Sequence, residues 1–329
     1  MLGTQITARD PLLYDVPLLI KQTFYPLGFP VQLHTNSEQI REAAAHVWSR
    51  CEPAFPTEPL QLWFAVDATA VSERPPALFP RAQGHLYSAV HSSDNFCISD
   101  FQRGFAYGWF SPAMVCDPGY FRYHFLEAVT YVTLDALHLT PIHAACIGLC
   151  GAGLVLCGQS GAGKTSLAFA CARRGWEFVC DDASHLVRNH ADPHLIVGKP
   201  HYIRFRESAR SLFAELVTCL PSLRANGKMD IEAASAELGI ERIRPQIHAA
   251  AVVFLNRDGA SPAALRPYPK DQAREFMEET ICVGEEHVRV AQRRSLDRFL
   301  DLPILQLTYS GFDDAERCLR AFLEKENRL

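Results

Sequence analysis

Near the middle of the chain, residues 158–166 read Gly158-Gln159-Ser160-Gly161-Ala162-Gly163-Lys164-Thr165-Ser166. This stretch matches G-x-x-x-x-G-K-[ST], the P-loop pattern in which a glycine-rich turn wraps phosphate groups. The glycines let the backbone turn its N–H groups toward phosphates, Lys164 supplies positive charge, and the Thr165 hydroxyl can ligate Mg²⁺. The pattern predicts a nucleoside triphosphate site formed by Gly158, Ser160, Gly161, Ala162, Gly163, Lys164, Thr165 and Ser166.

The segments on either side of this stretch support the same interpretation. Residues 154–157 are apolar and predict a buried strand that enters the loop, and residues 167–172 predict the helix that leaves it. A second apolar segment, residues 142–149, is separated from the first by Gly151-Ala152-Gly153. A tight glycine turn between two strands predicts a β-hairpin that leads directly into the loop.

Two adjacent carboxylates, Asp181 and Asp182, follow the next predicted strand, residues 176–180. Successive side chains at a strand end point in different directions, so one carboxylate can reach a metal ion while the other reaches a phosphate acceptor. Their proximity should raise the pKa of one of them, which favours a general base, although Mg²⁺ would oppose that change. The pair therefore predicts phosphoryl transfer chemistry beside the loop.

Taken together, the P-loop, the Arg173-Arg174-Gly175 helix end and Cys180-Asp181-Asp182 resemble the catalytic core of the HPr kinase/phosphorylase family. The resemblance is close over residues 141–190 and loose over the rest of the C-terminal half. It implies an α/β fold: a P-loop kinase domain of the HPr kinase/PEP carboxykinase-like type, with a mixed sheet and a hairpin entering the P-loop. It also implies a kinase that uses ATP or GTP with Mg²⁺ and phosphorylates a hydroxyl, either a serine of a protein or peptide or a small molecule.

The resemblance also implies roles for individual residues. Lys164 would be catalytic and bind the triphosphate, and Thr165 would hold Mg²⁺. Asp181 would be the catalytic base and Asp182 a metal ligand, with the two roles exchangeable. His143 occupies the position of a family histidine that opens the hairpin near the phosphates. Glu207 is the candidate for a further metal-binding carboxylate of the family.

The sequence departs from the family at two places. The Glu-Ile-Arg-Gly motif that carries the further carboxylate is absent, and Arg204-Phe205-Arg206-Glu207-Ser208 occupies the comparable region. No counterpart of the later segment associated with dephosphorylation is found. Arg289, Arg293 and Arg294 could supply a cation there, although a solvated helix face is the favoured account of them. We therefore expect an HPr-kinase-related protein and not HPr kinase itself.

Composition restricts the class of protein. The chain has 329 residues, 48% of them hydrophobic and 21% charged, with a net charge of −5. These values are typical of globular proteins, and the charge predicts no nucleic-acid partner. No secretory start, no apolar run of about 18 residues and no zinc-type Cys/His spacing is present. We expect a cytoplasmic protein without membrane contact, whose eleven cysteines are mostly free thiols. The resemblance leaves a homo-oligomer open.

The pattern of strands and helices predicts three parts. Residues 1–118 form a strand-rich α+β accessory domain, with an irregular lead-in at residues 1–15 and a proline-rich loop at residues 74–80. Residues 119–140 form a linking helix, and residues 141–329 form the catalytic domain. Within that domain we expect a helix over 207–217 and an insertion or flexible loop over 221–246.

Two alternatives to a kinase are considered. A nucleotide-binding regulatory or interaction protein with little phosphotransfer would explain the missing later motifs, although it has no need for both a metal ligand and a base. A motor or transporter ATPase would place its acidic residue later, for example at Asp258, and would carry a Leu-Ser-Gly-Gly-type signature, which the sequence lacks. A dinucleotide site at Gly151-Ala152-Gly153 is disfavoured because no helix follows.

Overall fold

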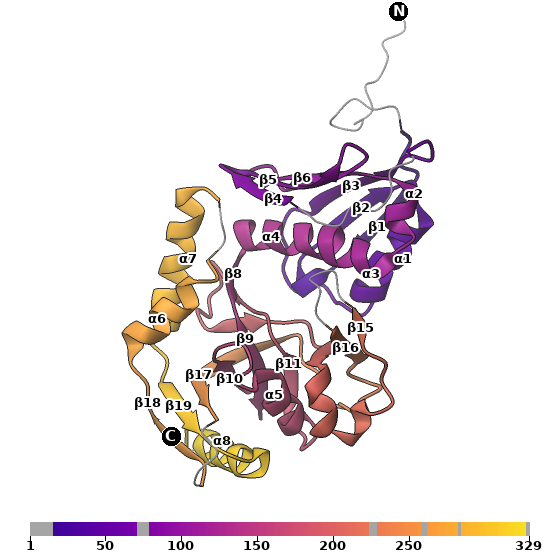
Figure 1. The fold of residues 1–329 in the computed structure, drawn as a ribbon. Coiled ribbons are helices and arrows are strands. Elements are labelled where there is room, and N and C mark those ends of the chain that lie inside the picture. The colour runs from indigo at the N-terminus through magenta and orange to yellow at the C-terminus, as the bar shows by residue number, and fades with distance from the viewer. Residues whose placement is uncertain (1–15, 71–78, 224–228, 258–261, 282–283, 327–329) are drawn as a thin grey trace, which may run out of the picture. The chain divides into compact units, whose positions relative to one another are not determined.

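The computed structural model describes residues 16–70, 79–223, 229–257, 262–281 and 284–326 (Figure 1). The predicted lead-in at residues 1–15 and most of the predicted loop at residues 74–80 lie outside these ranges. The chain divides into two compact units, Met1–Leu137 and His138–Leu329. The boundaries drawn from the sequence, at residues 118 and 140, stay a prediction.

The first unit is built on a sheet with strand order β1-β2-β3-β7-β6-β5-β4. Its strands are β1 (Ile20–Phe24), β2 (Val31–Thr35), β3 (Leu60–Val66), β4 (Phe79–Gln83), β5 (Leu86–Ser92), β6 (Asn95–Asp100) and β7 (Phe105–Phe110). The β2-β3 and β3-β7 pairs are parallel, and the other pairs are antiparallel. The sheet is therefore mixed, and its seven strands confirm the strand-rich pattern predicted for this region.

Helices cover one face of this sheet, as Figure 1 shows for α1, α3 and α4. The helical segments are η1 (Pro26–Gly28), α1 (Glu38–Trp48), α2 (Pro112–Val115), α3 (Pro118–Phe121), the π-helix η2 (Arg122–Glu127) and α4 (Ala128–Leu137). Edge-to-face contacts join Phe64 and Phe121 to Phe110 between sheet and helices. The helix predicted as a linker ends at Leu137 and belongs by its contacts to this unit.

The second unit is built on a larger mixed sheet with the order β11-β9-β10-β17-β13-β12-β8, to which β19 and β18 are added beside β17. Its strands are β8 (Leu139–Ile142), β9 (Ala144–Leu149), β10 (Ala152–Cys157), β11 (Glu177–Cys180), β12 (Ser184–Val187), β13 (Leu195–Val197), β17 (Gln246–Asn256), β18 (Ala264–Pro267) and β19 (Ile304–Thr308). The predicted hairpin is present as the antiparallel pair β9-β10. Its turn is Cys150-Gly151, both with positive φ, one residue earlier than expected.

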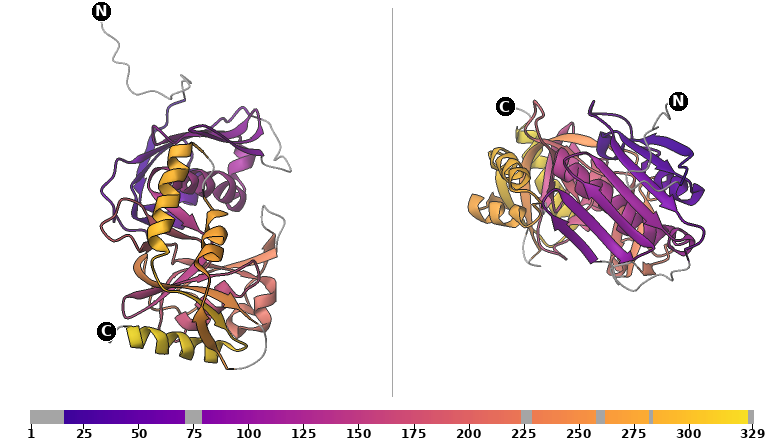
Figure 2. Two further views of the ribbon diagram at one scale, coloured as in Figure 1. Left: turned by 90° about the vertical axis from the view of Figure 1, so that its left-hand side faces the viewer. Right: turned by 90° about the horizontal axis from the view of Figure 1, so that it is seen from above.

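Two hydrophobic cores lie on the two faces of this sheet. Leu154 and Leu156 of β10 face a core shared with α5 (Lys164–Ala172) and α8 (Phe312–Glu326). Val155 and Cys157 face the other core, which is closed by α6 (Lys270–Glu278) and α7 (Glu286–Phe299). Figure 2 shows α6 and α7 together, away from α8. This alternation of buried side chains is that of a strand covered on both sides, and it confirms the predicted α/β class.

A small antiparallel sheet, in the order β14-β16-β15, packs beside α5. It consists of β14 (Tyr202–Arg206), β15 (Ser222–Leu223) and β16 (Met229–Ala234). The helix predicted over 207–217 is wrong, because this segment forms two 3-10 turns, η3 (Glu207–Ser211) and η4 (Ala214–Leu216). Phe213 between them is extended, and its ring packs edge-on against Phe169 of α5. The loop predicted over 221–246 likewise contains β15 and β16.

Candidate active site

The P-loop connects the carboxyl end of β10 to the first turn of α5. Gly158, Gly161 and Gly163 all have positive φ, a conformation that side-chain-bearing residues rarely adopt. A Cβ atom on Gly163 would also lie only 2.9 Å from the Tyr309 hydroxyl. That hydroxyl donates a hydrogen bond to the Ala162 carbonyl at 3.3 Å, so Tyr309 supports the loop from the end of β19. The loop backbone is thus fixed at the amino end of α5, where anions are favoured.

Lys164 is buried against this loop, with 6% of its surface exposed. Its ammonium donates to the Gly158 carbonyl at 2.7 Å and to His143 Nε2 at 3.1 Å. Burial lowers the pKa of Lys164, while the nearby Asp182 acts in the opposite direction. The cation is therefore held at the mouth of the loop by two acceptors from different segments.

His143 connects the lysine to one of the two carboxylates. It lies in the break between β8 and β9, and its Nδ1 atom is 3.4 Å from Asp182 Oδ1. Because the ammonium of Lys164 can only donate, Nε2 of His143 accepts, and the neutral ring then carries its proton on Nδ1. That proton faces Asp182. The three side chains form a row of ammonium, imidazole and carboxylate.

Asp181 and Asp182 follow β11 and occupy different environments. The Asp182 side chain is 61% exposed, whereas Asp181 is 9% exposed. Burial raises the pKa of Asp181 to about 6, and the neighbouring Asp182 adds to this effect, while a hydrogen bond from the Arg204 N–H opposes it. That N–H lies 2.7 Å from Asp181 Oδ2. Burial is thus the leading cause, ahead of the repulsion between carboxylates that the sequence suggested.

Thr165 and Ser160 complete the contacts around the loop. The Thr165 hydroxyl lies 3.4 Å from the Asp181 carbonyl, at the carboxyl end of β11. Ser160 is exposed, and its hydroxyl accepts a hydrogen bond of 2.5 Å from Arg206 of β14. The small sheet therefore reaches both the loop, through Arg206, and the carboxylates, through the Arg204 backbone.

Sequence reasoning did not assign a role to Arg204, Arg206 or Tyr309. Within residues 204–208 the sequence pointed only to Glu207, which is exposed and takes no part in the hydrogen bonds described for the site. The available signal was the alternation along β14, in which Ile203 and Phe205 are buried while Arg204 and Arg206 are not. The role of Glu207 as a metal ligand stays a prediction.

Two of the three α7 arginines that are candidates for a transition-state cation have a carboxylate partner on their own helix. Arg289 and Arg293 both form ion pairs with Glu286, at 2.6 and 3.3 Å. These contacts agree with the solvated helix face that the sequence also allowed.

Two further observations concern all the residues that the structure describes. The ten cysteines that lie in described residues all carry free thiols. Within the described ranges, we find no helix whose length and apolar character would let it cross a lipid bilayer.

Comparison with known proteins gives partial matches. A segment of the chain is 28% identical over 78 residues to an HPr kinase/phosphorylase of an Exiguobacterium strain, covering 24% of this chain and 25% of that protein. A segment is 33% identical over 73 residues to the HPr kinase/phosphorylase of Halalkalibacterium halodurans, covering 22% of this chain and 23% of that protein. The match thus spans about a quarter of the length of either relative.

Among solved structures, the Hpr(Ser) kinase/phosphatase from Coxiella burnetii aligns with 57% of this chain and 98% of its own, at 14% identity and a TM-score of 0.32. No family model matches the chain.

Proposed function

Since the chain is related to the HPr kinase/phosphorylase family, we propose that it is a kinase. It transfers the γ-phosphoryl group of ATP, or of GTP, to a hydroxyl group with the help of Mg²⁺. The acceptor is a serine of a protein or peptide, or a small molecule.

One arrangement carries this proposal, the row from Lys164 through His143 to Asp182, beside the buried Asp181. A P-loop that only binds nucleotide needs the loop and its lysine. Here two carboxylates are added at the end of β11, one exposed and one buried. These are the groups that phosphoryl transfer requires in addition to a phosphate cradle.

The residues of the site have the chemistry needed for a triphosphate and Mg²⁺. The positive-φ glycines let backbone approach phosphates closely, and Lys164 carries the matching charge. The Thr165 hydroxyl and the exposed Asp182 carboxylate are oxygen donors of the kind that Mg²⁺ prefers. When bound, Mg²⁺ offsets the negative charge of the phosphate oxygens. His143 would orient the Asp182 carboxylate through its Nδ1 proton.

We assign Asp181 as the general base. It would take the proton of the acceptor hydroxyl as that oxygen bonds to phosphorus and the nucleoside diphosphate leaves. A pKa raised to about 6 by burial suits this role, because a base is most effective when its pKa lies near the working pH. The hydrogen bond from Arg204 N–H holds one oxygen of Asp181 and leaves the other for the acceptor. The exchanged assignment, with Asp182 as base, is separated from this one by the variants below.

The cellular setting that we infer is the cytoplasm, where ATP is abundant and free thiols persist. The ten free cysteines among the described residues support this inference.

The decisive experiment identifies the labelled product. Purified protein is incubated with cell extract and γ-¹⁸O-labelled ATP, and the extract is searched for molecules that gain the label by mass spectrometry. We expect one dominant product, lost with Lys164→Met. Lys270→Met serves as a matched control, because Lys270 forms only a surface ion pair with Asp301.

The Asp variants then assign the base. We expect Asp181→Asn to abolish transfer while nucleotide binding is retained, and Asp182→Asn to leave residual transfer that rises with Mg²⁺ concentration. The reverse pattern would assign the base to Asp182. Nucleotide binding without a labelled product in any extract would refute the kinase and favour a nucleotide-dependent regulator.

A further inference from the structure

A second group of potential ligands lies in the second unit, away from the P-loop. Asp192 and His194 belong to the loop that leads into β13, and His248 lies on β17. The two strands pair antiparallel, with Leu195 opposite His248. The His194 carbonyl also accepts a hydrogen bond from the Ala249 N–H at 2.9 Å. The backbone thus fixes all three residues next to one another, although 56 positions separate Asp192 from His248.

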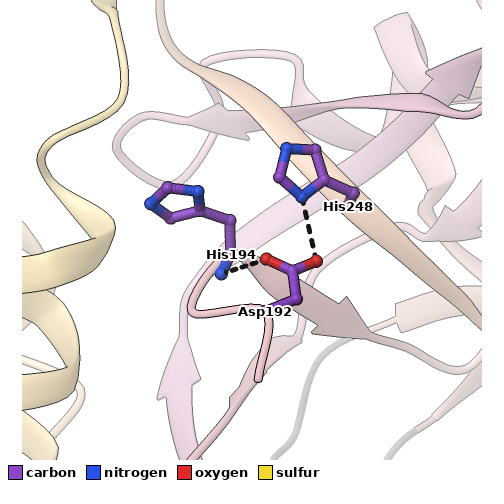
Figure 3. A group of neighbouring side chains, drawn as sticks. All are labelled: Asp192, His194 and His248. Carbon is purple, nitrogen blue, oxygen red and sulfur yellow. Dashed lines mark hydrogen bonds and ion pairs between the residues drawn. The ribbon is translucent and has the colours of Figure 1, made fainter. Parts of the chain in front are cut away.

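The Asp192 carboxylate faces both histidines, as Figure 3 shows. One oxygen accepts from His248 Nδ1 at 2.9 Å, and the other accepts from the His194 backbone N–H at 2.8 Å. One ligand atom from each of the three side chains lies within 4.8 Å of the others. A tetrahedral zinc ion with ligands at about 2.0 Å keeps its ligand atoms roughly 3.3 Å apart. Small side-chain rotations would bring the three atoms to that spacing.

The tautomer of His194 supplies an independent argument. Its Nε2 atom lies 3.2 Å from the carbonyl oxygen of Arg298 in the last turn of α7. A carbonyl can only accept, so Nε2 carries the proton and Nδ1 of the neutral ring presents a lone pair. Metal-binding histidines commonly donate their second ring N–H to a backbone carbonyl in this way, which fixes both tautomer and ring orientation.

We propose that Asp192, His194 and His248 form a binding site for a divalent transition metal ion of the zinc class, with water completing the coordination. Two imidazoles and one carboxylate are a ligand set that suits zinc better than Mg²⁺ or Ca²⁺. The His248 side chain is 53% exposed, so an ion can enter from solvent.

The position of this site argues for a structural role. In the β10-β17 pair, His248 lies opposite Ala152 and Phe254 lies opposite Cys157, the residue before the P-loop. His248 and Phe254 are six positions apart along β17, a distance of about 20 Å. The ion would therefore join the loop before β13 to strand β17, beside the last turn of α7 and at the opposite end of the β10-β17 pair from the P-loop.

The simpler alternative is a histidine–carboxylate pair without a metal. The chain contains such a pair for comparison, since His287 Nδ1 lies 3.6 Å from Glu285 and both residues lie at the start of α7. His287→Gln is therefore a matched control. It removes an exposed histidine beside a carboxylate but leaves the proposed ligands intact.

The test measures zinc binding to the full chain. Metal-stripped wild type, Asp192→Asn, His194→Gln, His248→Gln and His287→Gln are dialysed against buffered Zn²⁺, and bound zinc is counted. Zinc held by cysteines contributes equally to all five proteins and cancels in the comparison. We expect wild type and His287→Gln to bind about one ion more than each ligand variant. Equal zinc content in all five proteins would overturn the proposal.

A measurement on the unmodified chain keeps the test valid if a variant folds poorly. Zn²⁺ is added to wild type, and the imidazole signals are followed by NMR. The signals of His194 and His248 should shift at the first equivalent, while that of His287 stays in place. If His194 and His248 do not respond, the site does not bind zinc.

Discussion

The Nε2 atom of His143 lies 3.1 Å from Nζ of Lys164, so a histidine from outside the P-loop contacts the cation of the loop. On the other side of the same ring, Nδ1 faces Asp182 at 3.4 Å. One imidazole thereby connects the proposed phosphate-binding charge with the proposed metal ligand.

The two contacts of His143 can be removed separately. The amide of Gln can reach the Nε2 position toward Lys164, whereas the amide of Asn lies near the Nδ1 position and can still donate to Asp182. We expect His143→Gln to raise the Mg²⁺ concentration needed for half-maximal activity by about 10-fold, as loss of a group that orients a metal ligand commonly does. His143→Asn should keep the wild-type Mg²⁺ requirement. Identical Mg²⁺ titrations for the two variants would contradict this role.

The ionised Asp181 carboxylate should reduce the stability of the second unit, His138–Leu329, at neutral pH. Its folded-state pKa of about 6 lies above the ordinary 3.8, so the folded chain binds this proton more tightly than the unfolded chain does. Stability from this group is therefore present below about pH 4 and is lost as pH rises through 6, for a total of about 3 kcal/mol. Asp181→Asn should raise the free energy of unfolding at pH 8 and bring little gain near pH 4.

Urea unfolding at several pH values, without nucleotide, measures this effect. Asp182→Asn is the control, because it removes the neighbouring carboxylate, whose side chain is 61% exposed. A gain for Asp181→Asn that does not change with pH would indicate another origin.

The raised pKa of Asp181 also predicts how kcat/KM depends on pH on the acid side of the pH–rate profile. If Asp181 accepts the proton of the acceptor, only its ionised form is active, so kcat/KM should fall at acid pH by about tenfold per pH unit below the pKa of Asp181. Burial raises that pKa to about 6, and Mg²⁺ bound nearby opposes the rise. The profile is therefore measured with the acceptor identified above at several Mg²⁺ concentrations. A profile that stays flat down to the ordinary carboxylate range, about pH 4, would exclude Asp181 as the base.

Arg206 should act on the nucleotide as well as on the loop. Its guanidinium bonds the Ser160 hydroxyl, which brings a positive charge to the outer side of the P-loop. We expect Arg206→Gln to weaken nucleotide binding by about 10-fold at low salt and less at high salt, because exposed charges are screened. Ser160→Ala should cost only about twofold, because it removes one exposed hydrogen bond and leaves the charge of Arg206 in place. Equal losses for both variants would mean that Arg206 serves only to hold Ser160.

The features predicted from sequence are those with a local signal. The P-loop, the hairpin before it and α5 follow from the spacing of glycines and apolar residues, and the structure contains all three. The helix expected over 207–217 fails because Phe213 packs against α5, and this tertiary contact outweighs local helix propensity.

The features that sequence reasoning missed depend on pairing between distant segments. Arg206 reaches Ser160 only because β14 lies beside the loop, and the two residues are 46 positions apart. The family resemblance indicated His143. Its contact with Asp182 depends on its position between the end of β8 and the start of β9, which the sequence did not predict. The Asp192, His194 and His248 group is formed by strand pairing and has no recognisable spacing along the chain.

Strand β17 has hydrogen-bonded neighbours on both sides along most of its length. One side pairs with β10, while the other pairs first with β13 and then with β19. Amide protons in such a strand exchange with solvent only when the whole unit opens. In a hydrogen–deuterium exchange experiment, residues 246–256 should therefore be among the last to take up deuterium. Their exchange rate would report the global stability of the unit, while residues 158–163 would report nucleotide binding.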